Sequence, residues 1–285
     1  MLDNHPQLTI ANDTHFILRA AKRVLRRDPQ PLLTPDLVAA VRSYRRFYRM
    51  GLDESDVQAA TEHCRTYAEF VSRLYMLRGK KNQKELSGEK TPDNCRNMLL
   101  LHGLFPAARF VHIIRDGRNT ALSTLSWANE NKGPGKWSLW NEDPLATCAL
   151  WWRWQAGTGE RDSQGLGDRF YHRVKYEDLV AEPENRLEAI ARFLGIPYSV
   201  SMVNYHKGKT RHKPGLSAKS AWLPPVKNLR DWRTGMSAED NEVFEGIAGD
   251  LLREIGYPFS DSQPSAAVNA RVSRALAWWA SEGKS

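Results

Sequence analysis

An arginine and a serine, Arg115 and Ser123, lie eight positions apart on either side of a turn signal, Asp116-Gly117. The apolar run before the arginine, residues 110–114, is typical of a strand covered on both faces. Asp116 or Asn119 can cap the next helix, whose N-terminus favours anions. A guanidinium and a hydroxyl suit a phosphate monoester. The motif therefore predicts a phosphate site, with an ordinary strand–helix crossover and a salt-bridged arginine as the alternative.

The composition, 41% hydrophobic and 26% charged over 285 residues, is that of a globular protein. The net charge of +8 suits polyanionic ligands, but the basic residues are scattered, unlike those of a nucleic-acid-binding arm. Cys64, Cys95 and Cys148 share no metal-ligand spacing and are typical of reduced cytoplasmic thiols. There is neither a run of roughly 18 apolar residues nor a signal-peptide pattern. We therefore expect a cytoplasmic protein without a metal, a nucleic-acid partner or a membrane span.

Periodicity and turn residues predict helices that alternate with two buried strands, which favours an α/β sheet. The predicted strands are residues 110–114 and 170–176. The predicted helices are residues 35–49, 53–79, 93–104, 183–194 and 237–256, a helix with Trp151, Trp152 and Trp154 that we assign to the core, and a tail helix within residues 258–285. Residues 80–88, 127–143 and 206–228 are predicted to be loops. No repeat or domain boundary is evident.

Together these segments resemble the sulfotransferases that use 3′-phosphoadenosine 5′-phosphosulfate (PAPS). Residues 104–118, with Ser123 after them, are similar to the family's element for the nucleotide 3′-phosphate. Residues 89–92, Glu-Lys-Thr-Pro, resemble the lysine motif of the branch related to tyrosylprotein sulfotransferases. Residues 175–195 are similar to a later strand and helix of the family. The resemblance implies one P-loop-like α/β domain over residues 1–285, with a parallel sheet flanked by helices.

The resemblance also implies which residues bind the co-substrate PAPS. Arg115, Arg118 and Ser123 belong to the element that binds the 3′-phosphate, and Tyr176 would lie near the adenine. The family closes a basic loop over the nucleotide. Here that loop contains Ser217 and Lys227, for which solvated loop residues are the alternative reading.

The resemblance further implies a base for the acceptor. Asp13, followed by Thr14, takes the position of the branch's catalytic glutamate, and a helix cap is the alternative for this aspartate. His15 is the second candidate base, because its intrinsic pKa lies near neutrality. Lys90 would neutralise the leaving phosphate oxygen, unless it is a solvated surface lysine. The acceptor would be a hydroxyl of a small molecule, carbohydrate, lipid or protein tyrosine.

Two other functions stay open: a nucleotide-binding module of the same fold without turnover, and a P-loop small-molecule kinase, which the absence of Gly-x-x-x-x-Gly-Lys-Ser/Thr disfavours. In the family a strand and a loop resembling Pro-Arg-Ser-Gly-Thr-Thr, which cradles the 5′-phosphosulfate, precede the segment that matches residues 1–6. We therefore expect this chain to lack that strand and loop, to transfer little sulfate, and to extend about 15–30 residues upstream in its natural reading frame.

Overall fold

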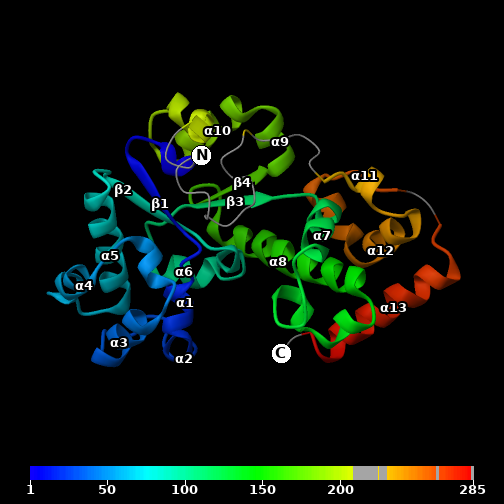
Figure 1. The fold of residues 1–285 in the computed structure, drawn as a ribbon, viewed down its shortest axis with the longest axis horizontal. Helices are drawn as coiled ribbons and strands as arrows, with labels where there is room; N and C mark the ends of the chain where they lie inside the picture. The colour runs from blue at the N-terminus through cyan, green and yellow to red at the C-terminus, as the bar shows by residue number, and fades with distance from the viewer. Residues whose placement is uncertain (208–223, 225–229, 261–262, 284–285) are drawn as a thin grey trace. The chain divides into compact units, whose positions relative to one another are not determined.

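The computed structural model describes residues 1–207, 224, 230–260 and 263–283, and Figure 1 shows the course of the chain. This described part alternates helices with short strands, which confirms the α/β class. The strands are β1 (Leu8–Asn12), β2 (Leu86–Lys90), β3 (Phe110–Ile114) and β4 (Tyr171–Lys175). β1 pairs with β2 and β3 with β4, so the described strands form two pairs instead of the single parallel sheet that the sequence predicted.

The chain divides into two compact units, each built from separate stretches of sequence. Unit 1 comprises Met1–Val111, Asp162–His172 and Glu182–Pro225, and unit 2 comprises His112–Arg161, Arg173–Ala181 and Val226–Ser285. Because the chain enters and leaves each unit more than once, no single linker marks a boundary in the sequence. The expected single domain over residues 1–285 and the expected segment upstream of Met1 both stay predictions.

Unit 1 is built on the parallel pair of β1 and β2, against which α5 packs. Its described helices are α1 (Phe16–Ala20), α2 (Lys22–Leu25), α3 (Pro35–Ser43), α4 (Glu54–Thr61), α5 (Tyr67–Lys81), α6 (Met98–Leu104) and α10 (Pro183–Leu194), with the 3₁₀ segments η1 (Leu2–Asn4), η2 (Phe47–Met50), η3 (Pro92–Arg96) and η6 (Val200–Lys207). Phe16, Phe47 and Phe70 are fully buried in its core. Burial of such rings contributes about 2–3 kcal/mol each to the stability of the unit.

Side-chain caps decide where several helices of unit 1 begin. Thr34 accepts a hydrogen bond from the backbone of Leu37 at the start of α3. Thr66 and Glu69 form a capping box at the start of α5, in which each side chain accepts a hydrogen bond from the other's backbone N–H. This second start divides the helix that we predicted over residues 53–79 into α4 and α5.

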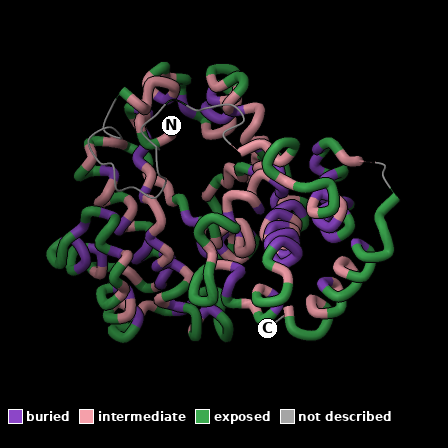
Figure 2. The backbone as a smooth tube through the Cα atoms, turned by 45° about the vertical axis from the view of Figure 1, so that its right-hand side comes forward, coloured by how far each residue is buried: buried purple, intermediate pink, exposed green. Residues whose placement is uncertain are grey.

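Unit 2 contains α7 (Gly117–Leu125), α8 (Pro144–Leu166, whose end belongs to unit 1), α9 (Tyr176–Ala181), α11 (Trp232–Gly235), α12 (Ala238–Ile255) and α13 (Ala266–Ser281), with η4 (Gly133–Lys136) and η5 (Ser138–Asn141) in the predicted loop. α12 is capped by Ser237 and ends at Gly256, as the sequence predicted. The tail helix is confirmed as α13, which packs on α12 and is mostly exposed or half-buried in Figure 2.

The tryptophans of α8 fit the core prediction only in part. Trp152 is buried and its ring lies 5.9 Å from that of Phe244 on α12. Trp151 and Trp154 are half-buried and contact the ring of Trp137 in the loop before α8.

Among the residues that the structure describes, no helix combines the length and the apolar character that crossing a membrane requires.

Candidate functional site

Unit 1 brings Asp13, His15 and Lys90 together where two parallel strands end. In the register of β1 and β2, Asn12 lies opposite Lys90, so Asp13 is the first residue beyond the shared edge. The carboxyl ends of parallel strands are where α/β proteins bind ligands, because the strands deliver side chains from distant sequence to one edge. Parallel pairing of these two short strands therefore accounts for the meeting of Asp13 with Lys90.

The backbone turn from Asp13 to His15 is strained and firmly held. Asp13 and His15 have φ angles of +62° and +56°, in the left-handed region that non-glycine residues rarely adopt. The N–H of Asp13 donates to the carbonyl of Lys90 at 2.7 Å, and the N–H of His15 donates to the Thr91 hydroxyl at 3.3 Å. Such strain costs on the order of 1–3 kcal/mol per residue and persists only when surrounding contacts enforce it.

Glu89 supplies most of those contacts, and the sequence analysis gave it no role. Its carboxylate accepts hydrogen bonds from the N–H and hydroxyl of Thr14, at 3.3 and 2.9 Å, and from the Thr91 hydroxyl. Its other oxygen accepts from the Tyr75 hydroxyl at 2.7 Å, and burial together with this carboxylate raises the pKa of Tyr75 well above its usual value. In the sequence, the one feature that could have pointed to a role for Glu89 is its position directly before Lys90.

The Asp13 carboxylate is surrounded by basic groups. Lys90 Nζ lies 3.6 Å from one of its oxygens and His15 Nε2 lies 3.4 Å from the same oxygen. The guanidinium groups of Arg49 and Arg46 lie 3.6 and 4.0 Å from the other oxygen. The Asp13 side chain is 22% exposed, so a ligand can reach it. This arrangement can accept a proton from a hydroxyl and place a cation beside it.

The alternative readings of Asp13 and Lys90 do not fit these contacts. The N-cap of α1 is His15, and α1 has no side-chain hydrogen bond at this cap, so the predicted helix-cap role of Asp13 is wrong. Lys90 is half exposed but paired with Asp13, which differs from a lysine surrounded only by solvent.

Unit 2 brings Arg115 and Tyr176 together at the end of β3. The indole N–H of Trp152 donates to the carbonyl of Arg115 at 3.1 Å and fixes its backbone. The guanidinium carbon lies 4.9 Å from the centre of the Tyr176 ring, within the range of a cation–π contact, and one nitrogen donates to the carbonyl of Arg230 at 3.5 Å. Arg115 Nε is buried and has no hydrogen-bond partner among the described residues.

These features of unit 2 fit a ligand that carries a phosphate. A buried guanidinium N–H without a partner costs free energy unless an acceptor such as a phosphate oxygen binds it. Ser123 lies half-buried on α7, and no hydrogen bond from its hydroxyl is found within the described part of the chain. Tyr176 begins α9 directly after β4 and offers an aromatic face. Arg115, Ser123 and Tyr176 therefore offer a guanidinium, a hydroxyl and an aromatic face to a ligand.

The N-terminus of α7 is less open to an anion than the sequence predicted. Asp116 is its N-cap and accepts the N–H of Arg118 at 2.9 Å. The N–H of Asp116 itself donates to Glu177 at 3.0 Å, and Glu177 also accepts the hydroxyl of Tyr257 at 2.9 Å. Two carboxylates thus occupy amide groups that we expected to be free for a ligand.

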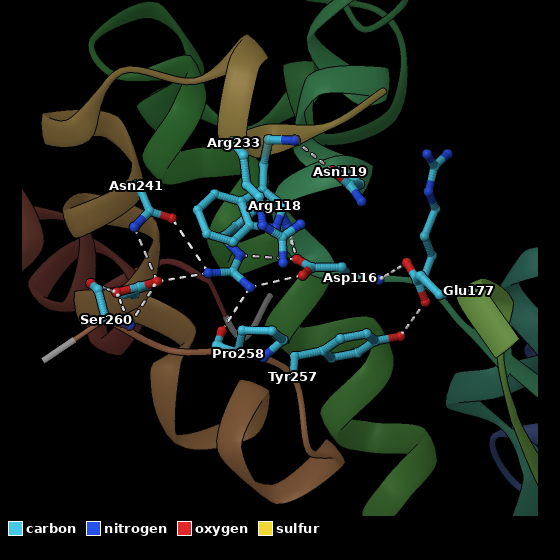
Figure 3. A network of polar contacts seen from close by, with 12 residues as sticks. Asp116, Arg118, Asn119, Glu177, Arg233, Asn241, Tyr257, Pro258 and Ser260 are labelled. Atoms are coloured by element: carbon cyan, nitrogen blue, oxygen red, sulfur yellow. Dashed lines mark hydrogen bonds and ion pairs between the residues drawn. The ribbon is translucent and has the colours of Figure 1, made fainter. Parts of the chain in front are cut away.

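Arg118 is the main correction to the predicted site. Its side chain is fully buried and binds the Asp116 carboxylate through two nitrogens (Figure 3). A third nitrogen binds Glu245 at 2.7 Å. It also donates to the carbonyl of Pro258 at 2.7 Å and lies 3.7 Å from the ring centre of Trp232. This guanidinium is held inside unit 2, so we leave Arg118 out of the nucleotide-binding group.

The two remaining candidates, Ser217 and Lys227, lie outside the described residues. Within the described ranges, no group of three or more histidine, cysteine or acidic residues is arranged to hold a metal ion.

Comparisons with known proteins give the family. The model of the sulfotransferase family matches residues 1–200, so the chain belongs to that family. It is 22% identical over 270 residues to protein-tyrosine sulfotransferase A of Caenorhabditis elegans, which covers 93% of this chain and 64% of that protein. The chain therefore spans under two thirds of the length of this relative.

The chain is also similar to two further proteins. Carbohydrate sulfotransferase 1 of Mus musculus is 27% identical over 95 residues, or 33% of this chain and 23% of that protein. A sulfotransferase domain from the curacin biosynthetic pathway has a TM-score of 0.52 and 15% identity, over 96% of this chain and 90% of that one. At 15% identity, the likeness to the curacin-pathway domain concerns the fold alone.

Proposed function

We propose that this protein transfers a sulfuryl group from PAPS to a hydroxyl acceptor. The observation that carries the proposal is the Asp13 carboxylate, fixed by a strained turn beyond β1 with Lys90 Nζ 3.6 Å away. Membership of the sulfotransferase family supports this reaction over phosphoryl transfer. PAPS supplies a sulfuryl group that is activated for transfer by its bond to a phosphate oxygen.

In this proposal the residues of unit 1 act on the acceptor. Asp13 accepts the proton of the acceptor hydroxyl, which makes its oxygen a stronger nucleophile. Lys90 provides positive charge for the phosphate oxygen that departs. Glu89 acts through the turn, because its bonds to Thr14 keep the Asp13 backbone in its strained conformation.

The residues of unit 2 bind the nucleotide. Arg115 and Ser123 bind the 3′-phosphate, the guanidinium through charge-assisted hydrogen bonds and the serine through its hydroxyl. The Tyr176 ring packs against the adenine. These roles use the buried Arg115 Nε, the described contact between Arg115 and Tyr176, and the position of Ser123 on α7.

The acceptor class is proposed as a hydroxyl, with protein tyrosine and carbohydrate as the first candidates. The names of two relatives supply these candidates, one being a protein-tyrosine and the other a carbohydrate sulfotransferase.

The test is transfer of radiolabelled sulfate from PAPS to a panel of a tyrosine peptide, an oligosaccharide and a simple phenol. Single-turnover conditions, with enzyme in excess over donor, make even slow transfer measurable. We expect labelled product with at least one acceptor and roughly 10²–10⁴-fold less with Asp13→Asn. Binding of the donor product without any transfer would favour the binding module instead.

A further inference from the structure

His15 lies between two carboxylates that come from different parts of unit 1. Its Nε2 is 3.4 Å from an oxygen of Asp13, and its Nδ1 is 3.3 Å from an oxygen of Asp93, which lies in η3. The ring is 9% exposed. The proposed function above uses Asp13 but leaves both His15 and Asp93 without a task.

The surroundings of Asp93 indicate which nitrogen of His15 carries hydrogen. A neutral imidazole has one N–H donor, so it can donate to only one of the two carboxylates. Arg19 and Arg96 bind Asp93 at 2.7 and 2.8 Å, and its pairing with His15, followed by the hydrogen bonds of the two arginines, holds the pKa of Asp93 well below its usual range. Asp93 is therefore a fixed anion 3.3 Å from Nδ1, a buried atom with no hydrogen-bond partner in the described chain, and its charge favours the hydrogen on Nδ1, which leaves the lone pair of Nε2 on the side of Asp13.

The charged groups around Asp13, His15 and Asp93 are compatible with a proton moving from Asp13 to His15. Asp13 faces Lys90, Arg49 and Arg46 on its other sides, so a positive His15 is not required to pair its negative charge. A carboxylate that orients an imidazole in this way also stabilises the imidazolium once it forms.

We propose that His15 takes the acceptor's proton from Asp13, and that Asp93 is the positioning residue that holds His15 for this step. As the acceptor oxygen bonds to sulfur, the bond from sulfur to the phosphate oxygen breaks and its electron pair leaves on that oxygen. The acceptor proton passes to Asp13 and then to Nε2 of His15. Asp13 is again a carboxylate, and the imidazolium beside Asp93 later loses its proton to water.

This inference rests on the proposed function, and chemical rescue tests its kinetic side. We expect His15→Ala to lower single-turnover sulfate transfer by roughly 10²-fold, and imidazole in the buffer to restore part of it. Asp93→Asn should lower transfer about tenfold and move the midpoint of the pH–rate profile. Affinity for adenosine 3′,5′-bisphosphate should be unchanged in both variants. The control is His63→Asn, at an exposed position with φ of +60° that asparagine tolerates; it should neither lose activity nor respond to imidazole.

A second measurement does not depend on activity. Nitrogen-15 NMR of the histidine rings distinguishes the two neutral tautomers, and the His15→Ala spectrum assigns the His15 signals by their loss. We expect the Nδ1–H tautomer in the wild type and a shift toward Nε2–H in Asp93→Asn. Two results would overturn the inference. One is an Nε2–H tautomer of His15 in the wild type, and the other is a loss of transfer in His15→Ala that imidazole does not restore. If the wild type transfers no sulfate at all, the proposed function fails and the proton step fails with it, while the tautomer still reports the pairing with Asp93.

Discussion

Arg115 is the residue on which nucleotide binding should depend most. Its Nε is buried without a partner in the described chain, and its guanidinium already lies against Tyr176. We expect Arg115→Ala to weaken binding of adenosine 3′,5′-bisphosphate by about 2–3 kcal/mol and Ser123→Ala by about 1 kcal/mol. Titration calorimetry measures both. Adenosine 5′-phosphate, which lacks the 3′-phosphate, is the matched ligand, and its affinity should hardly change. Equal losses with both ligands would refute a 3′-phosphate contact.

Glu89 offers a second prediction for a single residue, because in the proposed function it acts on the reaction only through the turn. We expect Glu89→Gln to lower single-turnover transfer about tenfold, since an amide at this position cannot accept all the bonds from Thr14, Thr91 and Tyr75. Binding of adenosine 3′,5′-bisphosphate, which we propose for unit 2, should stay the same. Full activity in this variant would show that the strained turn does not need Glu89.

At the scale of elements, the buried Arg118 joins α7 to α12. Removing one partner of a buried ion pair leaves the other charge without compensation, which costs about 3–5 kcal/mol. We therefore expect Arg118→Met to lower the free energy of unfolding by this amount, because Asp116 and Glu245 stay buried.

A matched control is Arg153→Met, which removes the half-exposed arginine that pairs with Asp250 on α12. Exposed pairs contribute about 0–1 kcal/mol. Urea unfolding followed by tryptophan fluorescence reports on both variants, since every tryptophan of the described residues lies in unit 2. Similar losses in the two variants would contradict the structural role that we assign to Arg118.

The elements that the sequence predicted well carry local signals. The helix over residues 183–194 has a clear apolar period and ends at Gly195, which adopts the left-handed cap that glycine permits. β3 is a nearly continuous apolar run, interrupted by His112, and was predicted with its bounds, but it is not covered on both faces as expected, since Ile113 is 49% exposed. β2 was missed because Leu86–Lys90 holds a single large apolar residue, itself exposed, and is a strand only through its pairing with β1.

In the candidate site, too, contacts between residues distant in sequence could not be predicted from local sequence signals. Asp13, His15 and Lys90 were predicted and lie together, but only resemblance to a family linked them, since β1 and β2 are far apart in sequence. Glu89 and Asp93 were missed because their partners become visible only once the turn after β1 is formed. Arg118 was misassigned because its burial depends on Glu245, which is 127 positions away.

At the scale of the whole molecule, stability should fall at mildly acidic pH. Burial lowers the pKa of His112 on β3 to about 4, although Glu160 on α8 opposes the shift. Below pH 6.5 the unfolded chain therefore binds a proton at His112 that the folded chain excludes. The stability that neutral His112 contributes is complete above pH 6.5 and is lost as pH falls toward 4. It amounts to about 3 kcal/mol.

Replacing the titrating ring tests this dependence. We expect the free energy of unfolding of His112→Asn, measured by urea at several pH values, to change less than that of the wild type between pH 6.5 and 4. Parallel pH curves for the two proteins would show that another group is responsible.

The central claim, that this chain transfers sulfate with Asp13 as the base, is tested most directly by comparing Asp13→Asn with Lys90→Ala in single-turnover transfer from PAPS. We predict that Asp13→Asn lowers the transfer rate roughly 10²–10⁴-fold while the donor concentration for half-maximal rate stays nearly the same. Lys90→Ala should change both quantities, because in the proposed function its charge neutralises the donor's departing phosphate oxygen. Unimpaired transfer by Asp13→Asn would contradict the account.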